Sequence, residues 1–150
     1  MAEIQRYPFS KDALNDLRDN AFAAGNWPLV YVLSDEKHGR AYIGETTDTL
    51  TRMSTHLKHD EKQLLTAVHL ITSEYFNKSA TLDVESLLIK YMAADGKYTL
   101  LNGNLGLADH NYYQRSALYE EVFREVWNRL IAKGVVSRTL DHLDNSDVFK

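Results

Sequence analysis

The chain has 150 residues, with a hydrophobic fraction of 44% and a charged fraction of 25%, which are ordinary values for a globular protein with a buried core. A formal net charge of −4 argues against a broad polyanion-binding surface. The absence of cysteine excludes disulfides, thiolate zinc sites and cysteine nucleophiles. The sequence has no signal-peptide pattern and no apolar run long enough for a membrane span, so we predict a cytoplasmic protein without a membrane partner.

The first 27 residues are predicted to form an N-terminal helical extension, residues 1–27. Ser10 is a candidate helix cap, and Gly25 marks the end of the segment. The apolar residues between them fall on one helical face: Leu14, Leu17 and Ala21. We therefore expect one helix over residues 10–25.

Two short runs rich in β-branched and aromatic residues follow, LVYVLS at residues 29–34 and RAYIG at residues 40–44. Turn residues separate them, so the pattern predicts a β-hairpin. If the loop is symmetric, Tyr31 and Tyr42 lie nearly opposite each other on one face of the hairpin.

A short helix is predicted after Asp48, which is a candidate cap. Its apolar stripe has helical spacing and consists of Leu50, Met53 and Leu57. Arg52 and His56 are one turn apart and flank this stripe. Residues 66–72 then form a plausible third strand.

Two apolar helices are predicted in the second half of the chain, over residues 79–94 and 114–134. The Gly- and Asn-rich loop between them lacks the lysine of a phosphate-binding P-loop. Residues 135–150 lose helical periodicity, and we interpret them as a linker or tail that leads into a further region of a longer protein.

Glu85 is unusual for its surroundings within the first of these helices. The residues three, four and seven positions later are all apolar, whereas Asp83 and Lys90 share the predicted solvent face. A carboxylate beside a core is usually paired or bound to a metal ion. Taken alone, Glu85 is explained more simply by a structural salt bridge or an exposed helix edge. By the same standard, the Arg52 and His56 pair is explained as solvated surface.

In combination these residues have an order and spacing that resembles the GIY-YIG nuclease family. The residues that carry the resemblance are Tyr31, Tyr42-Ile43-Gly44, Arg52, His56, Glu85 and Asn102. The first motif is degenerate, Leu29-Val30-Tyr31, and the second is intact. The resemblance covers residues 28–103 and implies an α+β fold, a small three-stranded antiparallel sheet flanked by helices. The predicted nuclease domain, with its C-terminal helix, spans residues 28–134.

The resemblance also implies roles for single residues. Tyr31 would help to activate the attacking water, and Tyr42 would lie beside the scissile phosphate. Arg52 would contact the phosphate, and His56 would handle a proton or contact the phosphate. Glu85 would bind the cofactor, Mg²⁺ or Mn²⁺, for which one carboxylate suffices because Mg²⁺ keeps several waters. Asn102 would hold the site together, with Asn104 as a nearby alternative.

The implied function is a metal-dependent endonuclease that hydrolyses DNA phosphodiester bonds with water as nucleophile. The sequence departs from the family pattern at two positions. These departures favour an alternative function, a catalytically weak nucleic-acid or protein-binding module on the same fold. The first motif has lost its glycine, and Glu45 stands where some relatives carry a basic residue. A restriction-type enzyme is a third alternative. Because some domains of this family precede an ATPase or helicase-like region, the implied partners are DNA and such a region of a longer chain.

Overall fold

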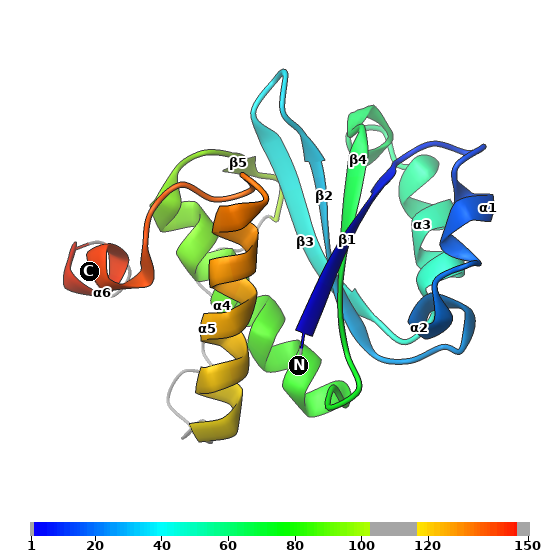
Figure 1. Ribbon diagram of the computed structural model, residues 1–150. Coiled ribbons are helices and arrows are strands. Elements are labelled where there is room, and N and C mark those ends of the chain that lie inside the picture. The colour runs from blue at the N-terminus through cyan, green and yellow to red at the C-terminus, as the bar shows by residue number, and fades with distance from the viewer. Residues whose placement is uncertain (1, 103–116, 147–150) are drawn as a thin grey trace.

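The structure is a computed structural model that describes residues 2–102 and 117–146 (Figure 1). Its strands are β1 (Ala2–Pro8), β2 (Leu29–Asp35), β3 (Arg40–Thr46), β4 (Ala67–Ser73) and β5 (Thr99–Leu100). Its helices are α1 (Leu14–Leu17), α2 (Ala21–Ala24), α3 (Thr49–Leu57), α4 (Lys78–Asp95), α5 (Ala117–Ala132) and α6 (Leu140–Ser146), and a 3-10 helix, η1, spans Lys62–Leu64. Figure 1 shows α1, α2 and α3 on one side of the sheet and α4, α5 and α6 on the other.

The sheet confirms the α+β class but has five strands in the order β1-β4-β2-β3-β5. The three predicted strands form its antiparallel centre, β4-β2-β3, and the expectation of only three strands is wrong. β1 pairs with β4 along its full length, and β5 adds a short parallel pair with β3 at Arg40 and Ala41.

The N-terminal segment is not wholly helical, which corrects the prediction for residues 1–27. Residues Ala2–Pro8 form an edge strand whose side chains at Ala2 and Ile4 are buried. The helix expected over residues 10–25 is divided into α1 and α2. Asn20 caps the N-terminus of α2, because its side chain accepts hydrogen bonds from the backbone N–H groups of Phe22 and Ala23. A new helix therefore begins at this point.

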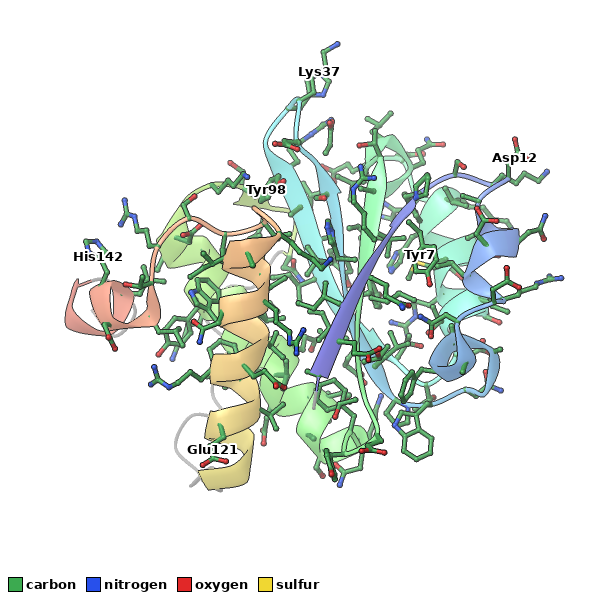
Figure 2. The ribbon with its side chains drawn as sticks, in the orientation of Figure 1. Tyr7, Asp12, Lys37, Tyr98, Glu121 and His142 are labelled. Carbon is green, nitrogen blue, oxygen red and sulfur yellow. The ribbon has the colours of Figure 1, made fainter. Side chains whose placement is uncertain are left out.

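The β2–β3 hairpin has a different register from the predicted one. Tyr31 pairs with Gly44, and Tyr42 pairs with Leu33, so the two tyrosines are diagonal neighbours on one face. The turn lies at residues 36–39 and contains Gly39 at a φ of 64°, with Lys37 at the tip (Figure 2). The strands therefore extend further toward the turn than the symmetric loop predicted.

Alternation along β2 divides the interior into two cores. Val30 and Val32 point toward α4 and α5, where the larger core contains Trp127. Tyr31 and Leu33 point to the opposite face, into a smaller core that also contains Met53 of α3. Tyr31 therefore belongs to the α3 side of the sheet.

The second half of the chain contains both predicted helices. α5 buries Trp127 and Leu130, and Gly134 follows it with a φ of 74°, which suits a helix end. α4 differs from expectation on one face, because Asp83 is buried whereas Leu82 is exposed. None of the helices in the described residues is long and apolar enough to cross a membrane.

The segment after α5 is not a linker over its described part, residues 135–146. It places four side chains in the larger core: Val135, Val136, Leu140 and Leu143. The Asp95 carboxylate accepts hydrogen bonds from the backbone N–H groups of Ser137 and Arg138, at 2.8 and 2.6 Å. The linker prediction is therefore wrong for these residues, whereas the domain boundaries at residues 28 and 134 stay predictions.

Candidate active site

Three aromatic side chains from three elements meet on the α3 side of the sheet. The Tyr31 hydroxyl on β2 lies 2.6 Å from His56 Nε2 on α3, in a hydrogen bond between buried groups. The His56 ring also packs edge-on against Tyr42 of β3, with the ring centroids 5.1 Å apart. The relative exposure is 0% for Tyr31 and 4% for His56. The three residues thus form one cluster.

Gly44 makes room for the Tyr31 ring. The two residues are paired across β2 and β3, and a Cβ atom built at Gly44 would lie 2.3 Å from both Cζ and the hydroxyl oxygen of Tyr31. No side chain fits at that distance unless the ring moves. The glycine of the Tyr-Ile-Gly motif is therefore required by the position of the tyrosine on the neighbouring strand.

Arg52 lies one helical turn before His56, on an exposed position of α3. Burial raises the pKa of Tyr31 above its ordinary value, and the neighbouring Tyr42 adds to that rise. Burial likewise raises the pKa of Tyr42, with a further contribution from the Glu85 carboxylate. The Arg52 guanidinium opposes both rises, so its charge acts on both phenols. Arg52 therefore supplies positive charge at the rim of the cluster.

His56 is held in its neutral form. Burial lowers its pKa to about 4, and the positive charges of Lys62 and Arg52 contribute to the decrease. At neutral pH the imidazole therefore carries one ring proton. The hydrogen bond can then run from the Tyr31 hydroxyl to an unprotonated Nε2 or from Nε2–H to the hydroxyl oxygen, according to which ring nitrogen carries the proton.

Glu85 lies half-buried on α4, and burial raises the pKa of its carboxyl to about 7. The charge of Glu45 raises it further, whereas Lys78 and Arg52 oppose the rise. Glu45 is buried at the end of β3, and both of its carboxylate oxygens accept from Lys78 Nζ, at 2.7 and 2.8 Å. The carboxylates of Glu85 and Glu45 are thus close enough to interact, and Glu45 is paired with Lys78.

Asn102 completes the open edge of β3. β5 pairs with β3 only at Arg40 and Ala41, and no other strand of residues 2–102 and 117–146 pairs with the edge beyond them. The Asn102 side chain accepts from the backbone N–H of Ile43 at 3.0 Å and donates to its carbonyl oxygen at 2.8 Å. It therefore fixes the residue between Tyr42 and Gly44. Asn104, the alternative to Asn102, lies outside the described residues.

The donor set is compatible with a weakly held divalent cation. Among the described residues there is no group of three His, Asp or Glu side chains that would enclose a metal ion. Glu85 nevertheless has a carboxylate whose ionisation is opposed by burial and by Glu45, which is the environment that a cation would relieve. Mg²⁺ commonly binds through one or two carboxylates and keeps its remaining waters. Glu85 therefore fits as the single protein carboxylate of such a site.

Sequence reasoning missed two features of this site. Lys62 of η1 places Nζ 3.9 Å from the centroid of the Tyr42 ring, and burial together with Arg52 lowers the pKa of its ammonium group. The second feature is the ion pair of Glu45 with Lys78 beside Glu85. Lys62 lies within a run of charged residues, where no sequence signal distinguishes it from a solvated lysine.

Comparison with known families gives one match. Residues 28–98 match the family model described as the GIY-YIG catalytic domain, so this part of the chain is similar to that domain. The match includes Tyr31, Tyr42, Arg52, His56 and Glu85, and it ends before Asn102. No curated protein and no solved structure gives a significant match. The comparisons indicate no ATPase or helicase-like region within the 150 residues.

Proposed function

We propose that this protein is an endonuclease that hydrolyses phosphodiester bonds of DNA, with water as the nucleophile and Mg²⁺ or Mn²⁺ as the cofactor. The observation that carries the proposal is the 2.6 Å hydrogen bond between the Tyr31 hydroxyl and His56 Nε2. In the proposed mechanism the His56 proton is on Nδ1, so the Tyr31 phenol donates to Nε2 and can accept a proton from water while it passes its own proton on. The pair therefore supplies the base that hydrolysis requires.

The proton balance of this step is simple. Attack of water on phosphorus releases one proton to the Tyr31 oxygen, and the Tyr31 proton moves to His56 Nε2, which becomes an imidazolium. Two of the causes that hold the pKa of His56 near 4 are the charges of Lys62 and Arg52. A bound phosphate counteracts both charges, so substrate binding raises the basicity of His56.

Arg52 and Lys62 provide the positive charge that hydrolysis needs. Negative charge accumulates on the phosphoryl oxygens during attack, and prearranged cations stabilise it. The guanidinium of Arg52 is exposed and offers a planar pair of donors that matches phosphate oxygens. We assign the phosphate contact to Arg52 and a supporting electrostatic role to Lys62.

Glu85 is proposed to hold the divalent cation, with water in its other coordination positions. When bound, the ion supplies Lewis-acid stabilisation of the phosphoryl and leaving-group oxygens. The role of the chain is to hold the Glu85 carboxylate within electrostatic range of Tyr42 and Arg52, and the cation would favour its ionised form. Asn102 acts as a positioning residue through its two hydrogen bonds to Ile43.

A catalytically weak binding module on the same fold is the second candidate. It is favoured by the net charge of −4 and by the ion pair that engages Lys78 with Glu45. DNA is the proposed substrate of the endonuclease, whereas the binding module would take a nucleic acid or a protein. An ATPase or helicase-like partner region stays a prediction from the resemblance, since it would add the DNA affinity that an acidic chain lacks.

Cleavage of labelled single-stranded, duplex and forked DNA in Mg²⁺ or Mn²⁺ distinguishes the two candidates. We expect cleavage by the wild type and its loss in Glu85→Ala and Arg52→Ala, with circular dichroism and melting temperature as folding controls. Absence of cleavage on every substrate, together with retained DNA binding, would favour the binding module.

A further inference from the structure

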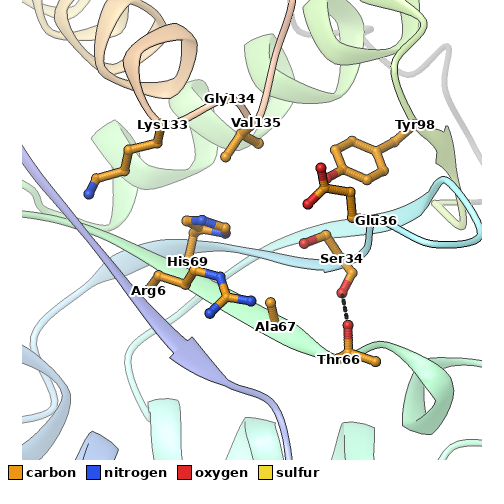
Figure 3. A pocket seen from close by; sticks show the side chains of 10 residues that line it. All are labelled: Arg6, Ser34, Glu36, Thr66, Ala67, His69, Tyr98, Lys133, Gly134 and Val135. Atoms are coloured by element: carbon orange, nitrogen blue, oxygen red, sulfur yellow. Dashed lines mark hydrogen bonds between the residues drawn. The ribbon is translucent and has the colours of Figure 1, made fainter.

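A cavity lies on the face of the sheet opposite the cluster of Tyr31 and His56, between β2, β4 and the end of α5 (Figure 3). Its volume is about 90 Å³. The residues that line it include Arg6, Ser34, Glu36, His69, Tyr98 and Lys133. None of these residues belongs to the site built around Tyr31, so the cavity is separate from the nuclease chemistry.

His69 is the feature of this cavity that most needs a partner. Its relative exposure is 6%, and its Nδ1 atom is buried without a hydrogen-bond partner in the described part of the chain. Buried polar atoms are nearly always paired with protein, water or a bound ligand. Figure 3 shows the imidazole standing between Arg6 and Lys133 at the cavity. His69 thus lines the cavity and has an unsatisfied ring nitrogen, which a small turn of the imidazole would present to a ligand.

The side chains near His69 carry positive charge at one end of the cavity. Arg6 is the register partner of His69 across β1 and β4, and Lys133 follows α5 above them. Both charges, after the larger effect of burial, lower the pKa of His69 to about 4. Glu36 lies at the other end, beside Tyr98 (Figure 3). The Arg6 and Lys133 end therefore favours an anion, and the Glu36 end disfavours one.

We propose that this cavity is a binding site for one phosphate-sized oxyanion, held by Arg6, Lys133 and His69. The size supports this class of ligand, because about 90 Å³ equals roughly three water molecules at liquid density. Pockets for larger organic ligands begin at roughly 300 Å³, so a whole nucleotide does not fit. Neutral His69 can donate a hydrogen bond from one ring nitrogen to such an anion.

The proposal is independent of the proposed nuclease function. His69 and Ser34 lie on the α5 side of the sheet, whereas Tyr31 and its partners lie on the α3 side. Loss of DNA cleavage in an active-site variant would leave the oxyanion site unchanged. Conversely, failure to bind an oxyanion here would say nothing about cleavage.

The test is a titration of the isotope-labelled wild-type chain with inorganic phosphate, followed at the His69 Cε1–H NMR signal. We expect a saturable shift and a higher pKa of His69 in phosphate than in chloride of equal ionic strength. Arg6→Ala/Lys133→Ala should weaken phosphate binding about tenfold or more. The matched control, Lys11→Ala/Arg18→Ala, removes the same charges from exposed positions elsewhere and should change binding less than about twofold.

Two sources of this ligand chemistry are separated by a second arm with a short duplex DNA. If a DNA phosphate occupies the site, the Arg6→Ala/Lys133→Ala variant also loses DNA affinity and shows a shallower salt dependence than the control. If the ligand is a free ion, DNA affinity is equal in the two double variants. The proposal is overturned if phosphate up to about 50 mM leaves the His69 signal and pKa unchanged, or if both double variants bind phosphate equally.

Discussion

Gly44 and Tyr31 face each other across the β2–β3 hairpin, and the tyrosine ring occupies the space in which a Gly44 side chain would lie. The glycine of the Tyr-Ile-Gly motif is thus explained by a close approach of the Tyr31 ring rather than by an unusual backbone angle. The close approach couples the backbone of β3 at Gly44 to the position of Tyr31, the proposed base, on β2.

Gly44→Ala should therefore displace Tyr31 and destabilise the fold by about 1–3 kcal/mol, the usual range for overpacking. Urea unfolding measures this cost. A double-mutant cycle with Tyr31→Ala is the control, because removal of the ring removes the clash and Gly44→Ala should then cost much less. Equal costs in the two backgrounds would contradict the steric explanation.

Tyr31→Phe should abolish most of the proposed cleavage, with a loss of about 10²-fold or more, because it removes the group that exchanges protons with water and His56. The fold should lose only about 1 kcal/mol, the usual net value of a hydrogen bond. Tyr7→Phe is the matched control, since that hydroxyl bonds to Gln5 away from the cluster. Single-turnover cleavage at matched folding is the measurement. Full activity in Tyr31→Phe would reject the Tyr31–His56 relay.

Glu85 makes metal binding and stability depend on pH in opposite directions. Its pKa is raised from 4.5 to about 7 in the folded chain, so the folded state binds more protons than the unfolded state between these values. Stability without metal should therefore fall as pH rises from about 4.5 through 7. Mg²⁺ affinity should rise over the same interval, because the ion binds the ionised carboxylate.

Glu85→Gln tests both statements. Without metal, this variant should be about 1 kcal/mol more stable than the wild type at pH 8 and equally stable at pH 5, a gain discounted for partial exposure. It should also lose Mg²⁺ binding measured by calorimetry. Glu74→Gln, at an exposed position, is the control. A wild-type Mg²⁺ affinity that is independent of pH would count against Glu85 as the ligand.

Lys62→Gln should raise the pKa of His56 above its value of about 4, because the ammonium group is the largest electrostatic contributor to the depression. NMR titration of the His56 Cε1–H signal measures the change. Lys58→Gln removes an equal charge from an exposed position near the end of α3 and should leave that pKa unchanged. Equal shifts in both variants would show only a general effect of net charge.

The central fold was predictable because its signals are local. Periodicity and turn residues predict the β2–β3 hairpin, α3 and the apolar helix α4, and the structure contains all three. β1 was missed because only Ala2 and Ile4 of its alternating pattern are buried, which is too little for a sequence signal. The last segment was misjudged because its buried residues pack against α4 and α5 rather than following one helical period.

The candidate site was predictable only in part. The motif residues followed from the resemblance, and the structure places Tyr31, Tyr42 and His56 in contact. Lys62 and the pair of Glu45 with Lys78 depend on contacts between elements that no spacing in the chain reveals. The offset of Tyr42 from Tyr31 depends on the turn at residues 36–39, whose geometry the symmetric loop did not anticipate.

The pairing of β1 with β4 bears on how this domain can be handled as a fragment. A chain shortened to begin at residue 28 retains every proposed catalytic side chain but leaves the outer edge of β4 without its partner strand. Its unsatisfied backbone groups would then be open to a strand from another molecule. In the full chain β1 takes the edge position instead, with the charged residues Glu3 and Arg6 and with Pro8, which are residue types that disfavour edge-to-edge pairing. The first eight residues thus replace a vulnerable edge by a better protected one, although they contribute nothing to the proposed cleavage.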